Sequence, residues 1–380
     1  MYCERLEKAK ALIEVLDLDA AILFSPEAQF YFLGHDSFAG VNTPQALILA
    51  PRLEKPVMVI WRSDAPMLPH GGADMDVRAY DFGIESPAQA IAEALGSNIG
   101  TNGRYGWDAQ SAALNHALAI AIIEASGMMA PIDISVPIAR LRAFKTQDEF
   151  EAMRIAGTYA EKGLAALRRA AVPGATEMAV AAGIEAALRD AGSDYWAVPV
   201  ELASGDRSHH VHGTPTERVL EPGDLLHAEF GAVHNRYHAV GIQTVAVGAP
   251  PTSEARHFYN TARRCLAAGI AVARPGIPAA EIEAPALDIL SGEGLGDVFA
   301  MRFGYSVGIG YPPTWLEPFG ITRTNAEPIH RGMTFVMHTC ILNADKKIGA
   351  LVGGTFGMND TSLVRLAGAG DLSLHITGQS

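Results

Sequence analysis

The side chains best suited to chemistry gather between positions 209 and 238. Six of the 13 histidines of the chain fall here, at positions 209, 210, 212, 227, 234 and 238. An imidazole titrates near neutral pH and can therefore accept a proton and return it. Their spacing matches no ordered metal motif, although imidazole suits transition metals. A catalytic histidine, a transition-metal site and solvated loop histidines all stay open as interpretations.

One carboxylate interrupts an apolar run in the same region. Glu229 lies among Leu225, Ala228 and Phe230, a pattern typical of a buried strand. An unpaired ionised carboxylate is costly to bury, so Glu229 needs a function or a partner. It could act as a base or a nucleophile. Alternatively, it forms a structural pair with Arg236 or Arg302.

The first third of the chain alternates short β-rich runs with helical stretches. The pattern predicts strands at Ala20–Phe24, Ala46–Leu49 and Val57–Trp61, and helices at Pro87–Leu95 and Ala112–Ser126. This order indicates an α/β unit.

A helix start marks the boundary to a second domain. Thr146 is followed three residues later by Glu149, which is the capping-box spacing. We therefore predict domains at residues 1–140 and 141–380.

The second domain repeats one order of elements: helix, Pro-Gly, helix, strands. The predicted helices are Gln147–Ala171 and Glu177–Ala191 in the first copy, and Glu254–Arg274 and Ala279–Leu290 in the second. The strand beginning at Gly223 lines up with the strand beginning at Gly332, which makes Glu229 and His338 pseudo-equivalent. A duplicated half-domain would surround a central cleft, a favoured place for a binding site.

Composition excludes several classes of protein. The formal net charge is −13, from 29 Lys and Arg against 42 Asp and Glu, so we expect no nucleic-acid partner. The longest apolar stretches fall short of the roughly eighteen residues that cross a bilayer, so we expect no membrane partner. Residues Met1–Glu14 suit a helix and lack a signal-peptide core, which favours a cytoplasmic protein. Three scattered cysteines support no disulfide framework.

Three segments resemble the pita-bread superfamily, which includes methionine aminopeptidase, prolidase, creatinase and ectoine hydrolase. Glu27–Gly34 is similar to the family segment N-I-x-Y-L-T-G, and Arg140–Ala156 is similar to its linker R-x-x-K-s-x-x-E-x-x-x-M-R-x-A. Arg302–Glu317 is close to the stretch G-Y-x-I-G-x-x-x-P-P-D-W-x-E of ectoine-hydrolase-like members. The resemblance implies an N-terminal creatinase-type mixed α/β domain and a C-terminal pita-bread α+β domain with an internal pseudo-two-fold repeat.

The resemblance also bears on metal binding. Metallopeptidases of this fold hold two metal ions with two Asp, one His and two Glu, because hard cations prefer anionic oxygens. In this chain the two Asp positions fall on Glu229 and Val240, the His on Tyr305, and the Glu pair on His338 and Asn359. Only one carboxylate remains. We therefore expect no metal and no other cofactor.

The function that the resemblance implies is metal-independent hydrolysis of a non-peptide C–N bond in a small zwitterionic amino-acid derivative or compatible solute. His212 precedes Asp224 by twelve residues, the spacing of the catalytic histidine of creatinase, and is the expected proton shuttle. Glu229 is the expected nucleophile or base. The alternatives are a metallo Xaa-Pro peptidase, a lyase on a small zwitterion, and a non-catalytic binding protein.

Six further residues are expected to bind the small-molecule substrate through aromatic walls, an acid and the old metal pocket: Tyr31, Tyr305, Trp315, Glu317, His338 and Asn359. We also expect a homodimer, because related proteins complete each active site with the N-terminal domain of a neighbour.

Overall fold

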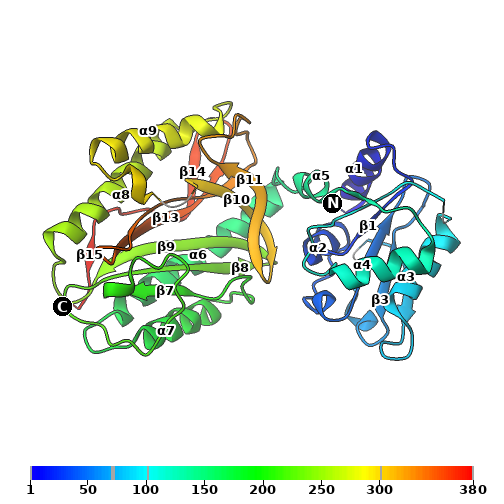
Figure 1. Cartoon of the computed structure of the whole chain (residues 1–380), viewed down its shortest axis with the longest axis horizontal. Helices are drawn as coiled ribbons and strands as arrows, with labels where there is room; N and C mark the ends of the chain where they lie inside the picture. The colour runs from blue at the N-terminus through cyan, green and yellow to red at the C-terminus, as the bar shows by residue number, and fades with distance from the viewer. Residues whose placement is uncertain (1, 70–72, 101, 300–301, 379–380) are drawn as a thin grey trace. The chain divides into compact units, whose positions relative to one another are not determined.

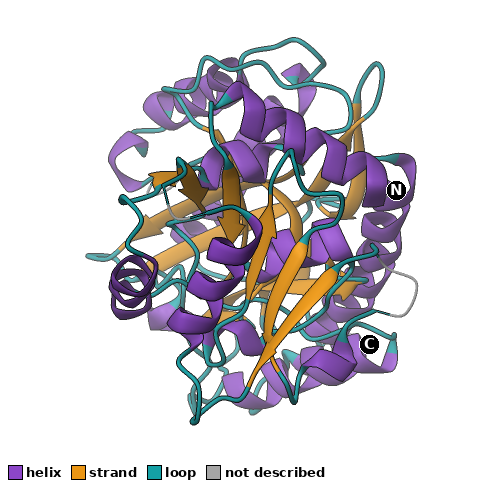
Figure 2. Cartoon of the chain, turned by 90° about the vertical axis from the view of Figure 1, so that its right-hand side faces the viewer, coloured by secondary structure: helices purple, strands orange, loops and turns teal. Residues whose placement is uncertain are grey.

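The computed structural model describes residues 2–69, 73–100, 102–299 and 302–378. The chain divides into two compact units, Met1–Arg142 and Ala143–Ser380 (Figure 1). In Figure 2 the strands of both units are orange and the helices are purple. Among the described helices, none combines the length and apolarity required to span a bilayer.

The first unit contains a mixed sheet that, within the described residues, has six strands in the order β4-β3-β2-β1-β5-β6. The strands are β1 (Ala20–Leu23), β2 (Ala46–Leu49), β3 (Val57–Trp61), β4 (Asp76–Tyr80), β5 (Tyr105–Trp107) and β6 (Ile132–Asp133). The helices are α1 (Tyr2–Val15), α2 (Pro26–Leu33), α3 (Pro87–Asn98), α4 (His116–Ser126) and α5 (Ser135–Arg140).

The predicted elements of this unit are present, with shifted ends. Strands β2 and β3 begin and end at the predicted residues. Helix α4 begins four residues later than predicted because Asn115 caps it, accepting a hydrogen bond from the backbone N–H of Leu118. Met1, the first residue of the predicted N-terminal helix, lies outside the described residues.

The second unit has a nine-stranded sheet within the described residues, and its main path runs β11-β10-β12-β13-β9-β8-β7. The strands are β7 (Glu201–Ser204), β8 (Leu225–His234), β9 (Tyr237–Ala246), β10 (Gly304–Tyr311), β11 (Thr314–Ile321), β12 (Thr334–Asn343), β13 (Ile348–Met358), β14 (Leu363–Gly368) and β15 (His375–Ile376). The helices are α6 (Gln147–Ala170), α7 (Glu177–Asp190), α8 (Ser253–Val272) and α9 (Ala279–Gly292). Short 3₁₀ turns occupy Ala39–Val41, Ala65–Met67, Gly205–Arg207 and Gly296–Val298.

The predicted repeat of helix pair and strands is present in the second unit. Helices α6 and α7 bury their apolar faces against β8 and β9, and α8 and α9 bury theirs against β12 and β13. The predicted capping box starts α6: Thr146 accepts from the Glu149 backbone, and the Glu149 carboxylate accepts from the Thr146 backbone.

The two halves of the repeat meet where β9 lies beside β13. Ile242 and Gly353 pair there in antiparallel register. A Cβ on Gly353 would lie 2.6 Å from the Cβ of His338 and 2.9 Å from the Cδ1 of Ile242, so only glycine fits. We call this junction the central seam.

Two buried threonines join the backbones of the central seam. The Thr244 hydroxyl donates to the Leu351 carbonyl at 2.7 Å and accepts from the Leu351 N–H at 3.0 Å. The Thr355 hydroxyl donates to the Val240 carbonyl at 3.0 Å and accepts from the Val240 N–H at 2.7 Å. Thr244 and Thr355 each stand two residues past the Ile242–Gly353 pair, so these bonds follow the symmetry of the repeat.

Replacing either hydroxyl by a methyl group would leave one buried N–H and one buried carbonyl without a partner. We predict that Thr244→Val and Thr355→Val each lower the free energy of unfolding by about 1–3 kcal/mol. Urea unfolding measures this loss, with the exposed Thr361→Val as the control. A loss no larger than that of the control would show that the hydroxyls do not hold the central seam.

Candidate functional site

The predicted cluster of polar residues lies on the face of the nine-stranded sheet opposite α6–α9, which we call the inner face. On β8, Leu226, Ala228 and Phe230 pack in the helix-side core. Since side chains alternate along a strand, His227 and Glu229 point to the inner face.

One row of paired residues crosses the inner face through the central seam. Glu201 on β7 pairs with Glu229 on β8, and Glu229 pairs with Ile242 on β9. Ile242 pairs with Gly353 on β13, and Gly353 pairs with His338 on β12. The predicted pseudo-equivalent residues Glu229 and His338 therefore stand at matching places on either side of the seam.

A chain of hydrogen bonds fixes the Glu229 carboxyl. The Tyr305 hydroxyl donates to Glu229 Oε1 at 2.9 Å, and the Trp315 indole N–H donates to the Tyr305 hydroxyl at 3.0 Å. All three side chains are buried. Burial raises the pKa of Glu229 to about 7, while the bond from Tyr305 acts in the opposite direction. The carboxyl therefore titrates where it can both hold and release a proton near neutral pH.

The sequence analysis did not identify Glu201, the second carboxyl of the row. Directly opposite residues on antiparallel strands have Cβ atoms about 4.5–5.5 Å apart, so Glu201 faces Glu229 at close range. Burial, and then the charge of Glu229, raise the pKa of Glu201 to about 8. The glutamate at the start of the run Glu201–Ser204 could have been noticed in the sequence. Its partner, however, depends on how β7 pairs with β8, which the sequence does not show.

His338 occupies the opposite end of the row. Its ring lies 5.7 Å from the Tyr305 ring, centroid to centroid, and its side chain is buried. Burial, with the nearby charges of Arg302 and His212, lowers the pKa of His338 to about 4, so its imidazole is neutral at pH 7. His338 Nδ1 has no hydrogen-bond partner among the described residues. His212 itself is exposed in the loop before β8.

The remaining predicted residues form other contacts. Glu317 forms a buried ion pair with Lys145 at 2.6 Å, rather than pairing at the surface. Asn359 is exposed after the end of β13, where its side chain accepts from backbone N–H groups of the following turn. Tyr31 lies in the first unit, and its hydroxyl donates to the Leu141 carbonyl at 2.9 Å.

The residues at the positions of the family's metal ligands do not fit a centre of two metal ions. The Tyr305 hydroxyl donates its hydrogen bond to Glu229, and Val240 is apolar. Asn359 follows the end of β13. Over residues 2–69, 73–100, 102–299 and 302–378, no group of three or more His, Cys, Asp or Glu is arranged to hold a metal ion. The described histidines between positions 209 and 238 therefore form no such group either.

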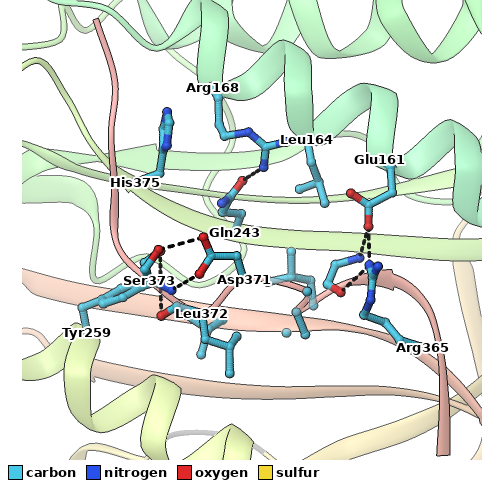
Figure 3. Close-up of a pocket in the computed structure, with 16 residues that line it drawn as sticks. Glu161, Leu164, Arg168, Gln243, Tyr259, Arg365, Asp371, Leu372, Ser373 and His375 are labelled. Carbon is cyan, nitrogen blue, oxygen red and sulfur yellow. Dashed lines mark hydrogen bonds and ion pairs between the residues drawn. The ribbon is translucent and has the colours of Figure 1, made fainter. Parts of the chain in front are cut away.

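A separate pocket of about 320 Å³ lies on the helix side of the sheet, between α6, α8 and the C-terminal segment (Figure 3). Its charged and polar side chains bind one another: Arg168 donates to Gln243, and Arg365 pairs with Glu161. Gln243 faces the side opposite Glu229, because it neighbours Ile242 on β9. Ile242 and Gly353 of the row also line this pocket, whereas Glu201, Glu229 and His338 do not.

The raised pKa values predict how stability depends on pH. A carboxyl with a folded pKa above its unfolded value of 4.5 keeps a proton that the unfolded chain has released. The folded state therefore loses stability as pH rises from about 4.5 through 7 to 8. Glu201→Gln removes one of these carboxyls.

We predict that Glu201→Gln raises the melting temperature relative to the wild type, more at pH 8 than at pH 5. Calorimetry at both values tests this, with the exposed Glu217→Gln as the matched control. A melting-temperature difference that stays constant with pH would contradict the burial of a titrating Glu201.

Comparisons with known proteins identify both units. Residues 151–365 match the model of metallopeptidase family M24, and residues 5–144 match the creatinase/prolidase N-terminal domain. The chain is 27% identical over 310 residues to the Xaa-Pro dipeptidase of Pyrococcus furiosus, covering 80% of this chain and 82% of that one.

Solved structures show the same architecture. Dipeptidase PepE from Mycobacterium ulcerans is 25% identical, with a TM-score of 0.84 over 99% of this chain and 97% of that one. A prolidase from Thermococcus sibiricus is 22% identical, with a TM-score of 0.90 over 99% of each chain. The predicted fold class, a creatinase-type domain followed by a pita-bread domain, is confirmed.

The predicted main function is wrong. The relatives named above are peptidases, which contradicts a hydrolase of non-peptide C–N bonds. The metal-independent, ectoine-hydrolase-like subtype likewise conflicts with the metallopeptidase model and the prolidase relatives. The error arose because the Arg302–Glu317 motif builds β10 and β11, which shape the fold without selecting the bond that is cleaved. The chain belongs to metallopeptidase family M24 and carries an N-terminal domain of the creatinase/prolidase type.

Proposed function

We propose that the chain acts on short peptides of the dipeptide class, with Xaa-Pro dipeptides as the first candidates, at the row on the inner face. The observation that carries this proposal is the similarity to an enzyme named Xaa-Pro dipeptidase over 80% of the chain and 82% of that relative. The polar groups on the inner face support it, because a buried carboxyl, a phenol and a neutral imidazole suit a small polar ligand.

Glu229 is the proposed acid–base group. Tyr305 occupies its Oε1, so Oε2 is the atom that gives or takes a proton. With a pKa of about 7, both protonation states are populated near neutral pH. His212 is the proposed second proton carrier, since it lies near His338 and its ring is exposed. No step passes through a metal ion, because the described residues do not fit one.

A second candidate is a protein that binds the same peptides without cleaving them. The specific observation in its favour is the poor fit of the inner face to the metal centre that the family name implies. The homodimer and the cytoplasmic location remain proposals.

Proline release from Gly-Pro, Ala-Pro and Leu-Pro tests cleavage, with the full chain assayed with and without added manganese. We predict that Glu229→Gln lowers the rate by about 10²–10⁴, the usual value of acid–base catalysis, while the melting temperature does not fall. The control Glu217→Gln keeps the wild-type rate.

Calorimetric titration with the same dipeptides separates the two candidates. Binding without proline release would favour the non-catalytic protein. The absence of both binding and release for all three dipeptides would refute the proposed function.

A further inference from the structure

We propose that Glu201 and Glu229 together bind a cationic amino group, namely the free N-terminal ammonium of the peptide. This inference rests on the proposed function. It adds the orientation of the peptide along the row. It also assigns a role to Glu201, a residue outside the set predicted from the sequence.

The geometry leaves two carboxyl groups turned to the same space. Glu201 and Glu229 are direct cross-strand partners on β7 and β8. Tyr305 binds only Oε1 of Glu229, so the second oxygen is free to accept. Within the described part of the chain, the Glu201 carboxyl forms neither a hydrogen bond nor an ion pair.

The electrostatics of this pair favour a cation. Besides each other, the groups that interact with the two carboxyls are the Tyr305 phenol and the Cys340 thiol. Burial raises the pKa values of both groups, so they stay neutral at pH 7. Ionising both carboxyls is unfavourable because the two negative charges repel each other, and an ammonium between them would offset that repulsion.

An independent observation points to a ligand beside this pair. His338 is 98% buried, with an exposed fraction of 2%, and its Nδ1 has no partner in the described residues. Buried polar atoms without a partner are uncommon in folded proteins, and a polar ligand atom would satisfy His338 Nδ1. The His338 imidazole faces the inner side of the sheet in the same row as Glu229.

Tyr305 connects the two ends of the proposed site. The Tyr305 hydroxyl contacts Glu229 at 2.9 Å, while the Tyr305 ring lies 5.7 Å from the His338 ring, centroid to centroid. One side chain, Tyr305, therefore contacts both the Glu229 carboxyl and the His338 imidazole. The Arg302 guanidinium places positive charge near His338, which suits the carboxylate of the peptide. The ligand therefore lies with its ammonium at Glu201 and its carboxylate toward His338.

Calorimetric titration of the full chain with three ligands tests this orientation. Gly-Pro carries both charges, N-acetyl-Gly-Pro lacks the ammonium, and glycinamide keeps the ammonium but lacks the carboxylate. We expect acetylation to weaken binding to the wild type at least tenfold. In Glu201→Gln we expect Gly-Pro to bind at least tenfold more weakly and acetylation to make little further difference. Glu217→Gln, an exposed carboxylate on the loop before β8, should bind like the wild type.

The outcomes separate this inference from the proposed function. Equal affinity of Gly-Pro and N-acetyl-Gly-Pro for the wild type overturns the ammonium subsite and leaves peptide binding intact. Binding of glycinamide that needs Glu201, without binding of Gly-Pro, supports the subsite and refutes the dipeptide. No binding of either amine overturns both.

Two further results keep the test decisive. Should Glu201→Gln not fold, Glu201→Leu removes the charge with a side chain suited to a partly buried strand. Manganese that binds through Glu201 and competes with glycinamide would show that the pair binds a metal ion, which overturns the ammonium.

Discussion

The central seam is the constraint on which the site depends. It joins the two halves of the repeat through the pairing of Ile242 with Gly353 and through hydroxyl bridges from Thr244 and Thr355. The same row of residues carries Glu229 on one side and His338 on the other. Because the strands are held at this junction, two residues more than a hundred positions apart in the sequence share one face of one sheet.

The chemistry on that face departs from what the family name suggests. The chain belongs to a metallopeptidase family, yet the described residues do not arrange three or more His, Cys, Asp or Glu around a common point. In their place stand two facing carboxyls, a tyrosine that binds one of them, and a neutral buried imidazole. Burial makes ionisation of the carboxyls unfavourable, and a cationic ligand is the simplest group that would offset this cost.

Short sequence patterns predicted individual helix starts and strands correctly. They did not predict contacts between residues that are far apart in the sequence. The Thr146 capping box and strands β2 and β3 follow from short patterns, and the repeat predicted that Glu229 and His338 are equivalent. Glu201 was missed because only the register of β7 on β8 reveals its partner. Similarly, Glu317 is paired with Lys145, which lies 172 residues earlier. The predicted function was wrong because the loss of metal-ligating residues characterises the site but does not identify the substrate.

The most direct test is the electron density of the chain crystallised with Gly-Pro and manganese. Our account predicts the amino nitrogen of the peptide within hydrogen-bond distance of both Glu201 and Glu229, with the carboxylate toward His338. Density for two metal ions coordinated by Glu229, or a peptide bound with its amino group at His338, would contradict it.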